Sequence, residues 1–348
     1  MKKQEFYFKS KDNETNIHMI MFEPDTKVNA ILQIIHGETE HMGMYKELAE
    51  YYTRAGIAIT GIDLIGHGMS TNNGAKKMTF GKEGSSNYVI EDINTCFDYV
   101  KKLHPDVPYI LMGISFGAIL ARSYLINYPR KVDGVILIGN WCLSTIKLNS
   151  LNKKVQHEIK KNGENAPAIK MKKRSIEKWN KRLKSTRTPY DYLLKSNETL
   201  DKFITDPLKG QTITNSLVRE IIKLIRYVQN PDNIKKMDTN KPILILSGEH
   251  DVATNYGEDS KKIYNEFKNY NVFDVTSNRV EGCRHDIMHD DNRYQVYDYI
   301  YGWIHNKMFR GLPVGKDEVL TQGVKAVVQI QDKVLKAAKE QQKRNNDQ

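Results

Sequence analysis

The segment Gly113-Ile-Ser-Phe-Gly117 places a serine between two glycines, where an apolar run gives way to a helical pattern. A serine hydroxyl attacks a carbonyl group when a neighbouring base takes its proton. A strand that turns abruptly into a helix strains the serine backbone and lifts the hydroxyl above the sheet. Gly113 and Gly117 suit such a turn, because a Cβ at either position would collide with the neighbouring strand or helix. The motif predicts Ser115 as a catalytic nucleophile.

Two polar groups downstream of Ser115 have the types that such a nucleophile needs. Asp251 follows an apolar run, and His285 lies in the loop after the next expected strand. The carboxyl ends of parallel strands meet at one edge of a sheet, so these side chains should lie near Ser115. We predict that His285 is the general base and then acid, and that Asp251 holds its tautomer.

Three neighbours compete for these roles. His250 is adjacent to Asp251, and His289 lies about one helical turn beyond His285. Glu249 is the rival for the acid. Chain order and position at the ends of strands favour Asp251 and His285.

Backbone N–H groups should stabilise the negative charge that develops on the carbonyl oxygen. We predict that these donors are the N–H groups of Glu38 and Phe116. Glu38 follows an early apolar run, and Phe116 follows the nucleophile. Each such donor typically contributes about 3 kcal/mol to transition-state stabilisation. A further loop, Asp63–Ser70, contains His67, and we expect Asp63 and Ser70 to tie its backbone by hydrogen bonds. The histidines and cysteines lack metal-ligand spacing, so we predict no metal and no cofactor.

Apolar runs alternate with helical patterns along most of the chain, which predicts an α/β protein with a mostly parallel, doubly wound sheet. The first two runs alternate more strictly and suit an antiparallel hairpin at one edge. We expect strands at 5–8, 17–22, 30–35, 57–62, 109–112, 132–138, 242–246 and 272–276. We expect helices at 42–54, 87–103, 116–127, 254–269 and 291–309.

The alternation stops after Gly139 and resumes at Pro242. The polar, basic and helical segment between them predicts a cap over the ligand-binding edge of the sheet. We therefore expect a core at 1–140 and 237–310, a basic helical cap at 141–236, and a C-terminal amphipathic helix with a disordered tail at 311–348.

Positive charge is concentrated in the expected cap. Between Lys147 and Arg187 stand fourteen Lys or Arg residues and three acids, so this segment accounts for the whole net charge of +11. One basic segment favours contact with an anionic membrane surface, or a solvated pair of helices, over nucleic acid. The three cysteines cannot form a full disulfide framework, the N-terminus has no signal-peptide pattern, and no apolar run could span a bilayer. We expect a cytoplasmic protein, peripheral to a membrane.

Five motifs together resemble the monoacylglycerol lipase and lysophospholipase group of α/β-hydrolases, also called serine aminopeptidase-like hydrolases. They are His36-Gly-x-x-Glu-His-x-x-x-Tyr45, Asp63-x-x-Gly-His-Gly-x-Ser70, Gly113-x-Ser-x-Gly117, Gly248-x-x-Asp251 and Gly282-x-Arg-His285. The resemblance covers about residues 5–309. It implies an α/β-hydrolase fold with an inserted helical cap over an acyl-chain pocket, the triad Ser115, Asp251 and His285, and ester hydrolysis through an acyl-enzyme.

The sequence departs from this group beside the nucleophile and in the His-Gly loop. Ile114 and Phe116 flank the serine where His and Met are usual, and Met44 replaces a common arginine. Glu38 stands where a small or apolar residue is usual, and its carboxylate would repel a developing oxyanion unless it points away.

The predicted function is a serine hydrolase that cleaves esters of a lipid such as monoacylglycerol or lysophospholipid. One alternative is a peptidase or other small-substrate acyl hydrolase, because one fold hosts many chemistries. The other is a non-catalytic homologue that binds a membrane or a partner, for which the basic cap is the motivation.

Overall fold

The computed structural model describes residues 1–71, 78–81, 83–210 and 212–309. The chain divides into two compact units, Met1–Asp291 and Asn292–Gln348. The helix α10 (Arg293–Met308) belongs to the second unit. The C-terminal helix and tail expected at 311–348 lie outside the described residues.

The first unit is built on an eight-stranded sheet with the order β1-β2-β4-β3-β5-β6-β7-β8. The strands are β1 (Lys2–Lys9), β2 (Asn16–Glu23), β3 (Ala30–Ile35), β4 (Ile57–Ile62), β5 (Tyr109–Ile114), β6 (Gly134–Ile138), β7 (Ile243–Gly248) and β8 (Val275–Val280). Strand β2 pairs antiparallel with β1 and β4, and all later pairs are parallel. The predicted fold class and the edge hairpin are confirmed.

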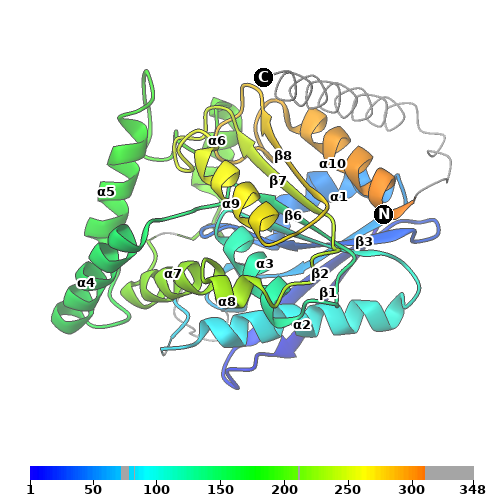
Figure 1. Ribbon diagram of the computed structural model, residues 1–348, viewed down its shortest axis with the longest axis horizontal. Helices are drawn as coiled ribbons and strands as arrows, with labels where there is room; N and C mark the ends of the chain where they lie inside the picture. Colours follow the sequence, from blue (N-terminus) through cyan, green and yellow to red (C-terminus); the bar gives the residue numbers. More distant parts are fainter. Residues whose placement is uncertain (72–77, 82, 211, 310–348) are drawn as a thin grey trace, which may run out of the picture. The chain divides into compact units, whose positions relative to one another are not determined.

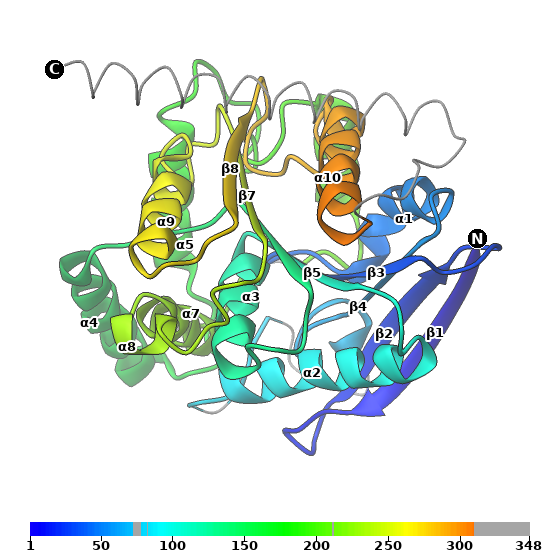
Figure 2. The same ribbon diagram turned by 45° about the vertical axis from the view of Figure 1, so that its right-hand side comes forward.

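Helices follow the strands and cover both faces of the sheet. They are α1 (Lys46–Thr53), which follows the short 3-10 helix η1 (Met42–Tyr45), then α2 (Ser86–Leu103), α3 (Phe116–Asn127) and α9 (Glu258–Asn269); a second 3-10 helix, η2, spans Gly68–Thr71. Helix α1 lies on the opposite face from α2 and α3 (Figures 1 and 2). Helix α9 contacts α3 through Arg122, whose guanidinium is 3.0 Å from the Glu266 carboxylate.

The continuous apolar runs became the buried centre of the sheet. Every residue of β3, β4, β5, β6 and β7 is buried. Helix α3 is also buried, from Phe116 to Ile126, because it lies directly against the sheet and beneath other helices. This rigid centre carries the strand ends from which the expected site residues emerge.

Two expected elements begin later than predicted. The last strand was placed at 272–276 but spans Val275–Val280, while Val272 is held in a turn by a 3.0 Å hydrogen bond from its N–H to Phe267 O. Strand β8 lies at the sheet edge and is half-exposed, so it lacks a long apolar run. The helix expected from 254 begins at Glu258, because residues 255–257 all have positive φ.

The segment between β6 and β7 forms α4 (Thr145–Asn162), α5 (Ile169–Asn180), α6 (Asn197–Thr205), α7 (Asn215–Val228) and α8 (Pro231–Ile234). Helix α7 packs on both α3 and α4, whereas no residue of α5 is fully buried. The green helices α4 and α5 stand away from the strands at the left of Figure 1. Within the described residues, no helix combines the length and apolarity needed to cross a membrane.

Candidate active site

Ser115 lies at the sharp turn between β5 and α3. Its backbone has φ 53° and ψ −113°, a conformation that side-chain-bearing residues rarely adopt. A 2.7 Å hydrogen bond from its N–H to Ile138 O holds the turn against β6. A Cβ on Gly113 would collide with the Gly117 carbonyl, and one on Gly117 with the Ile35 carbonyl. The local structure therefore has the geometry expected from the motif.

The structure brings Ser115, His285 and Asp251 together in one hydrogen-bonded chain. Ser115 Oγ lies 2.8 Å from His285 Nε2, and His285 Nδ1 lies 2.8 Å from Asp251 Oδ2. The Asp251 carboxylate also accepts hydrogen bonds from Thr254 Oγ1 at 2.7 Å and from the N–H of Ala253 at 2.9 Å. The side chains of these three residues are all buried. The carboxylate is thus fixed to accept the Nδ1 proton, which leaves Nε2 free to accept the serine proton.

Aromatic residues from the inserted segment surround His285. The Trp141 ring is inclined by only 12° to the imidazole, with the centroids 6.5 Å apart, and the Tyr192 ring lies 6.3 Å away. Burial alone would lower the pKa of His285, but the Asp251 carboxylate raises it above its ordinary value of 6.5. The site therefore stabilises the imidazolium that proton transfer from Ser115 would create.

The loop after β3 is held rigidly by two buried histidines. His36 Nδ1 donates to Gly37 O at 2.8 Å, while Nε2 accepts a 3.0 Å hydrogen bond from the N–H of Leu64. Burial, followed by the charge of His67, lowers the pKa of His36 to about 3, in agreement with this neutral form. His67 Nε2 lies 2.8 Å from Glu38 O. Among the described residues, none accepts a hydrogen bond from the N–H of Glu38 or of Phe116.

The Glu38 carboxylate forms an ion pair with Lys172 of α5. Both side chains are largely buried, with 10% and 13% of their surfaces exposed. Burial alone would lower the pKa of Lys172, but the Glu38 carboxylate raises it well above its ordinary value. Lys172 therefore stays charged and offsets the negative charge that sequence analysis identified as unusual at position 38.

A second buried cluster lies beside Met44, where the group usually has an arginine. His289 Nδ1 lies 2.9 Å from Asp286, its Nε2 lies 3.1 Å from Met44 O, and its ring lies 5.2 Å from that of Tyr45. Burial lowers the pKa of His289, but Asp286 and then Glu40 raise it to about 9. The Glu40 carboxylate accepts hydrogen bonds from Tyr45 Oη and, at 2.8 Å, from the N–H of Gly37. A protonated His289 thus supplies positive charge beside the loop that contains His36 and Gly37.

The rivals of His285 and Asp251 lie elsewhere. His250 is exposed beside Glu249, at 3.7 Å. Glu249 accepts a 3.0 Å hydrogen bond from the N–H of Gly282 instead of facing His285. The loop containing His67 is tied as expected, because Ser70 Oγ donates to Asp63 O at 2.7 Å and the N–H of Met69 donates to Asp63 Oδ2 at 2.8 Å.

A cavity of about 300 Å³ is lined in part by residues that neighbour the hydrogen-bonded chain. Glu38, Trp141 and Ala253 line it, and each touches or neighbours a residue of the site described above. The apolar part of its lining consists of Leu143, Leu151, Met171, Trp179, Ile213, Val218, Ile221, Ile222 and Ile225. Such a concave, apolar space beside a reactive side chain is typical of a substrate site.

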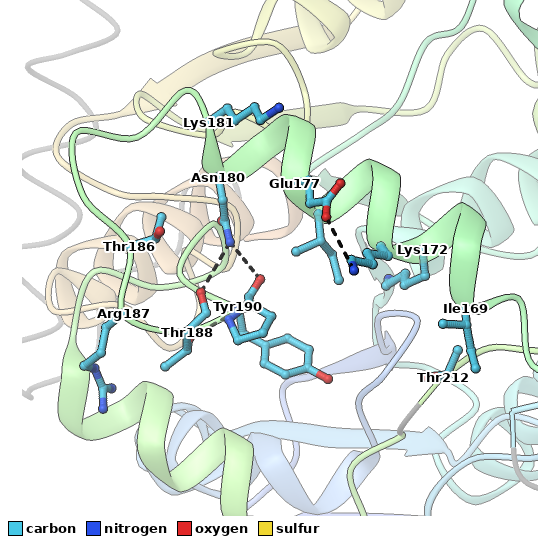
Figure 3. Close-up of a pocket in the computed structure, with 13 residues that line it drawn as sticks. Ile169, Lys172, Glu177, Asn180, Lys181, Thr186, Arg187, Thr188, Tyr190 and Thr212 are labelled. Atoms are coloured by element: carbon cyan, nitrogen blue, oxygen red, sulfur yellow. Dashed lines mark hydrogen bonds and ion pairs between the residues drawn. The ribbon is translucent and has the colours of Figure 1, made fainter.

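A second, more open cavity of about 620 Å³ lies along another face of α5 (Figure 3). The Asn180 amide donates to the carbonyls of Thr188 and Pro189, at 3.3 and 3.1 Å, and so ties the end of α5 to the following loop. Lys172 lines both cavities. Helix α5 therefore separates two hollows that share the cation bound to Glu38.

The order of the strands, together with a serine at the β5–α3 turn and partners after β7 and β8, defines an α/β-hydrolase. The chain belongs to the serine aminopeptidase family, S33, whose model matches residues 26–292. A carboxyl esterase from Bacillus coagulans shares the fold, with a TM-score of 0.79 and 23% identity over 88% of this chain and 99% of that one.

Two curated relatives carry lipase or phospholipase names. A monoacylglycerol lipase of Mycolicibacterium smegmatis is 30% identical over 34% of this chain and 40% of its own length. Phospholipase YtpA of Bacillus subtilis is 21% identical over 77% of this chain and 92% of its own length. The match to the Mycolicibacterium lipase spans less than half of that relative's length. The same holds for a match to a monoglyceride lipase homolog of Monkeypox virus, which covers 42% of that protein. The chain is thus related to monoglyceride lipases.

Sequence reasoning missed the residues that the inserted segment contributes to the site. The segment 141–236 contains Lys172, Trp141 and Tyr192, but its sequence predicted only a polar, basic and helical cap. The acid predicted at position 38, beside the oxyanion, implies a cationic partner, but the fourteen basic residues between Lys147 and Arg187 are alike as candidates in the sequence. His289 was considered only as a rival of His285, although its spacing from Asp286 allowed the observed pair.

Proposed function

We propose that this protein is a serine hydrolase that cleaves carboxylic esters of single-chain lipids, such as monoacylglycerol or lysophospholipid, through an acyl-enzyme. The hydrogen-bonded chain Ser115–His285–Asp251 carries this proposal. The apolar cavity beside it supports a substrate with a hydrocarbon chain. The lipase names of the relatives agree with this substrate class.

In the proposed acylation step, His285 Nε2 takes the proton of Ser115 as Oγ attacks the ester carbonyl carbon. The N–H groups of Glu38 and Phe116 stabilise the oxyanion. The intermediate collapses, and His285 gives its proton to the departing alcohol. Water then attacks the acyl-enzyme, with His285 as base, and releases the fatty acid and the free serine. The net reaction consumes one ester and one water and yields one acid and one alcohol.

The test of this function is Ser115→Ala. The variant should lose labelling by a fluorophosphonate probe and lose hydrolysis of long-chain esters, because among the described residues only the Ser115 hydroxyl is hydrogen-bonded to His285 Nε2. Esters of graded chain length and aminoacyl amides should be compared with the unchanged protein. Undiminished labelling of the variant would overturn the nucleophile, and a preference for aminoacyl amides would favour the peptidase alternative.

The same proposal includes a membrane surface as the source of substrate. Lys153, Lys160 and Lys161 of α4 are exposed and would attract anionic lipid by about 1 kcal/mol each near the surface. Sedimentation with vesicles that contain phosphatidylserine should bring down more protein than sedimentation with neutral vesicles. Equal sedimentation with both would remove the membrane from the proposal.

A further inference from the structure

The 300 Å³ cavity combines an apolar wall with an excess of positive charge. Helix α7 contributes Val218, Ile221, Ile222 and Ile225 to one wall. Five cations also line it, and Glu38 is the single carboxylate among the described lining residues. Because Lys172 already pairs with Glu38, four cations are left, which we call the rim cations: Lys147, Lys154, Arg174 and Lys178.

The rim cations are solvent-exposed, and none has an ion-pair partner within the described part of the chain. None of them forms an ion pair there, although nearby lysines such as Lys173 and Lys262 do. Lys147 and Lys178 lie close enough that burial and then the charge of Lys178 lower the pKa of Lys147, while Asp259 acts in the opposite direction. Like charges gathered around an apolar space repel one another, and a bound anion would remove that repulsion.

The rim cations belong to the proposed substrate site. They share their cavity with Glu38, whose N–H is a proposed oxyanion donor, and with Trp141, whose ring lies nearly parallel to that of His285. A ligand that fills the cavity would therefore contact the apolar wall and the rim cations, with its ester near Ser115. An amphiphile with one hydrocarbon chain and an anionic headgroup has this distribution of chemistry.

We infer that the preferred substrate is an anionic single-chain lipid ester with a phosphate headgroup, and not the uncharged monoacylglycerol. This inference rests on the proposed ester hydrolase function. The apolar wall takes the hydrocarbon chain, and the rim cations take the phosphate. An uncharged headgroup would offer these cations no opposite charge.

The kinetic test compares 1-acylglycerol 3-phosphate with 1-acylglycerol of the same chain length, both in nonionic micelles. The unchanged protein should show a kcat/KM about tenfold higher for the phosphate ester. Lys147→Gln/Lys178→Gln should lose that preference, mainly through a higher KM for the phosphate ester.

The matched control is Lys153→Gln/Lys160→Gln, which removes the same charge from exposed positions of α4 that do not line the cavity. It should keep the preference for the phosphate ester. If both double variants lost the preference for the phosphate ester equally, the basic surface as a whole would be attracting that substrate, and the inference would be overturned. Equal rates of the unchanged protein on the two esters would also overturn it.

A binding measurement separates this inference from the hydrolase function. Trp141 and Trp179 line the cavity, so their fluorescence should report a ligand there. Ser115→Ala should bind dodecyl phosphate about tenfold more tightly than dodecyl glycerol ether, and Lys147→Gln/Lys178→Gln should abolish the difference. Failure of ester hydrolysis with this binding preference intact would reject the reaction and keep the anion site. Equal binding of both probes would reject the anion site.

Discussion

The ammonium group of Lys172, on the inserted helix α5, pairs with the carboxylate of Glu38 in the loop after β3. The pair joins a helix without fully buried residues to the hydrogen-bonded loop that offers a proposed oxyanion donor. It explains how an acid is accommodated at a position where negative charge would oppose the reaction. We therefore propose Lys172 as a positioning residue, whose effect on the rate can be separated from its effect on folding.

Lys172→Met should lower kcat by about tenfold to a hundredfold, because the unpaired Glu38 carboxylate would then repel the developing oxyanion. Glu38→Gln/Lys172→Met should restore much of this loss, since the double variant has no carboxylate to neutralise. Lys173→Met, at the exposed neighbouring position, should leave kcat unchanged. Steady-state kinetics on one ester checks all three, and a double variant as slow as Lys172→Met would show a merely structural role.

The rate should depend on pH through His285. The proposed base must be neutral to accept the serine proton, so kcat/KM should rise with pH through an apparent pKa above 6.5. Asp251→Asn removes the carboxylate that raises this pKa, so the acidic limb should move to lower pH while kcat falls about 10⁴-fold. A pH–rate profile of both proteins is the measurement. An acidic limb that stays in place in the variant would contradict this account of the pKa.

Stability should fall at alkaline pH because of His289. Its pKa is raised to about 9 in the folded protein, against 6.5 for a free histidine. The stabilisation is therefore complete below about pH 6.5 and is lost as the pH rises through about 9. The free energy of unfolding should drop between these limits by on the order of 2 kcal/mol more in the unchanged protein than in His289→Gln. Urea titrations at several pH values would show this, and parallel pH dependences would refute it.

The turn at the nucleophile should tolerate no side chain at Gly117. A Cβ there would meet the carbonyl oxygens of Ile35 and His36, both in the central sheet or its exit loop. Gly117→Ala should therefore destabilise the fold by roughly 2–4 kcal/mol and lower the rate as β5 and α3 shift. Ile146→Ala, at an exposed position of α4, is the control and should change the melting temperature little. Equal melting temperatures for the two variants would speak against the close packing of this turn.

Local patterns were sufficient for the centre of the fold. The bounds of β3, β4 and α3 agree with the expected ranges, because each is a short apolar run or a helix entered through a glycine-bounded turn. Strand β8 was misplaced, since a half-exposed edge strand lacks the apolar signal on which the prediction relied. Chain order also identified Ser115, Asp251 and His285, which the fold brings together across separations of 34 and 170 residues.

What the sequence by itself determined was the sheet, the turn at Ser115 and the residue types that the strand ends present to it. Only the tertiary structure decided which residues of the inserted segment reach that site. Lys172 is one of fourteen basic residues between Lys147 and Arg187, and it meets Glu38 across 134 positions of the chain. The physical reason is that apolar faces such as that of α7 set how the inserted helices pack. The polar faces carry many similar lysines, and only that packing selects the one that meets a buried carboxylate.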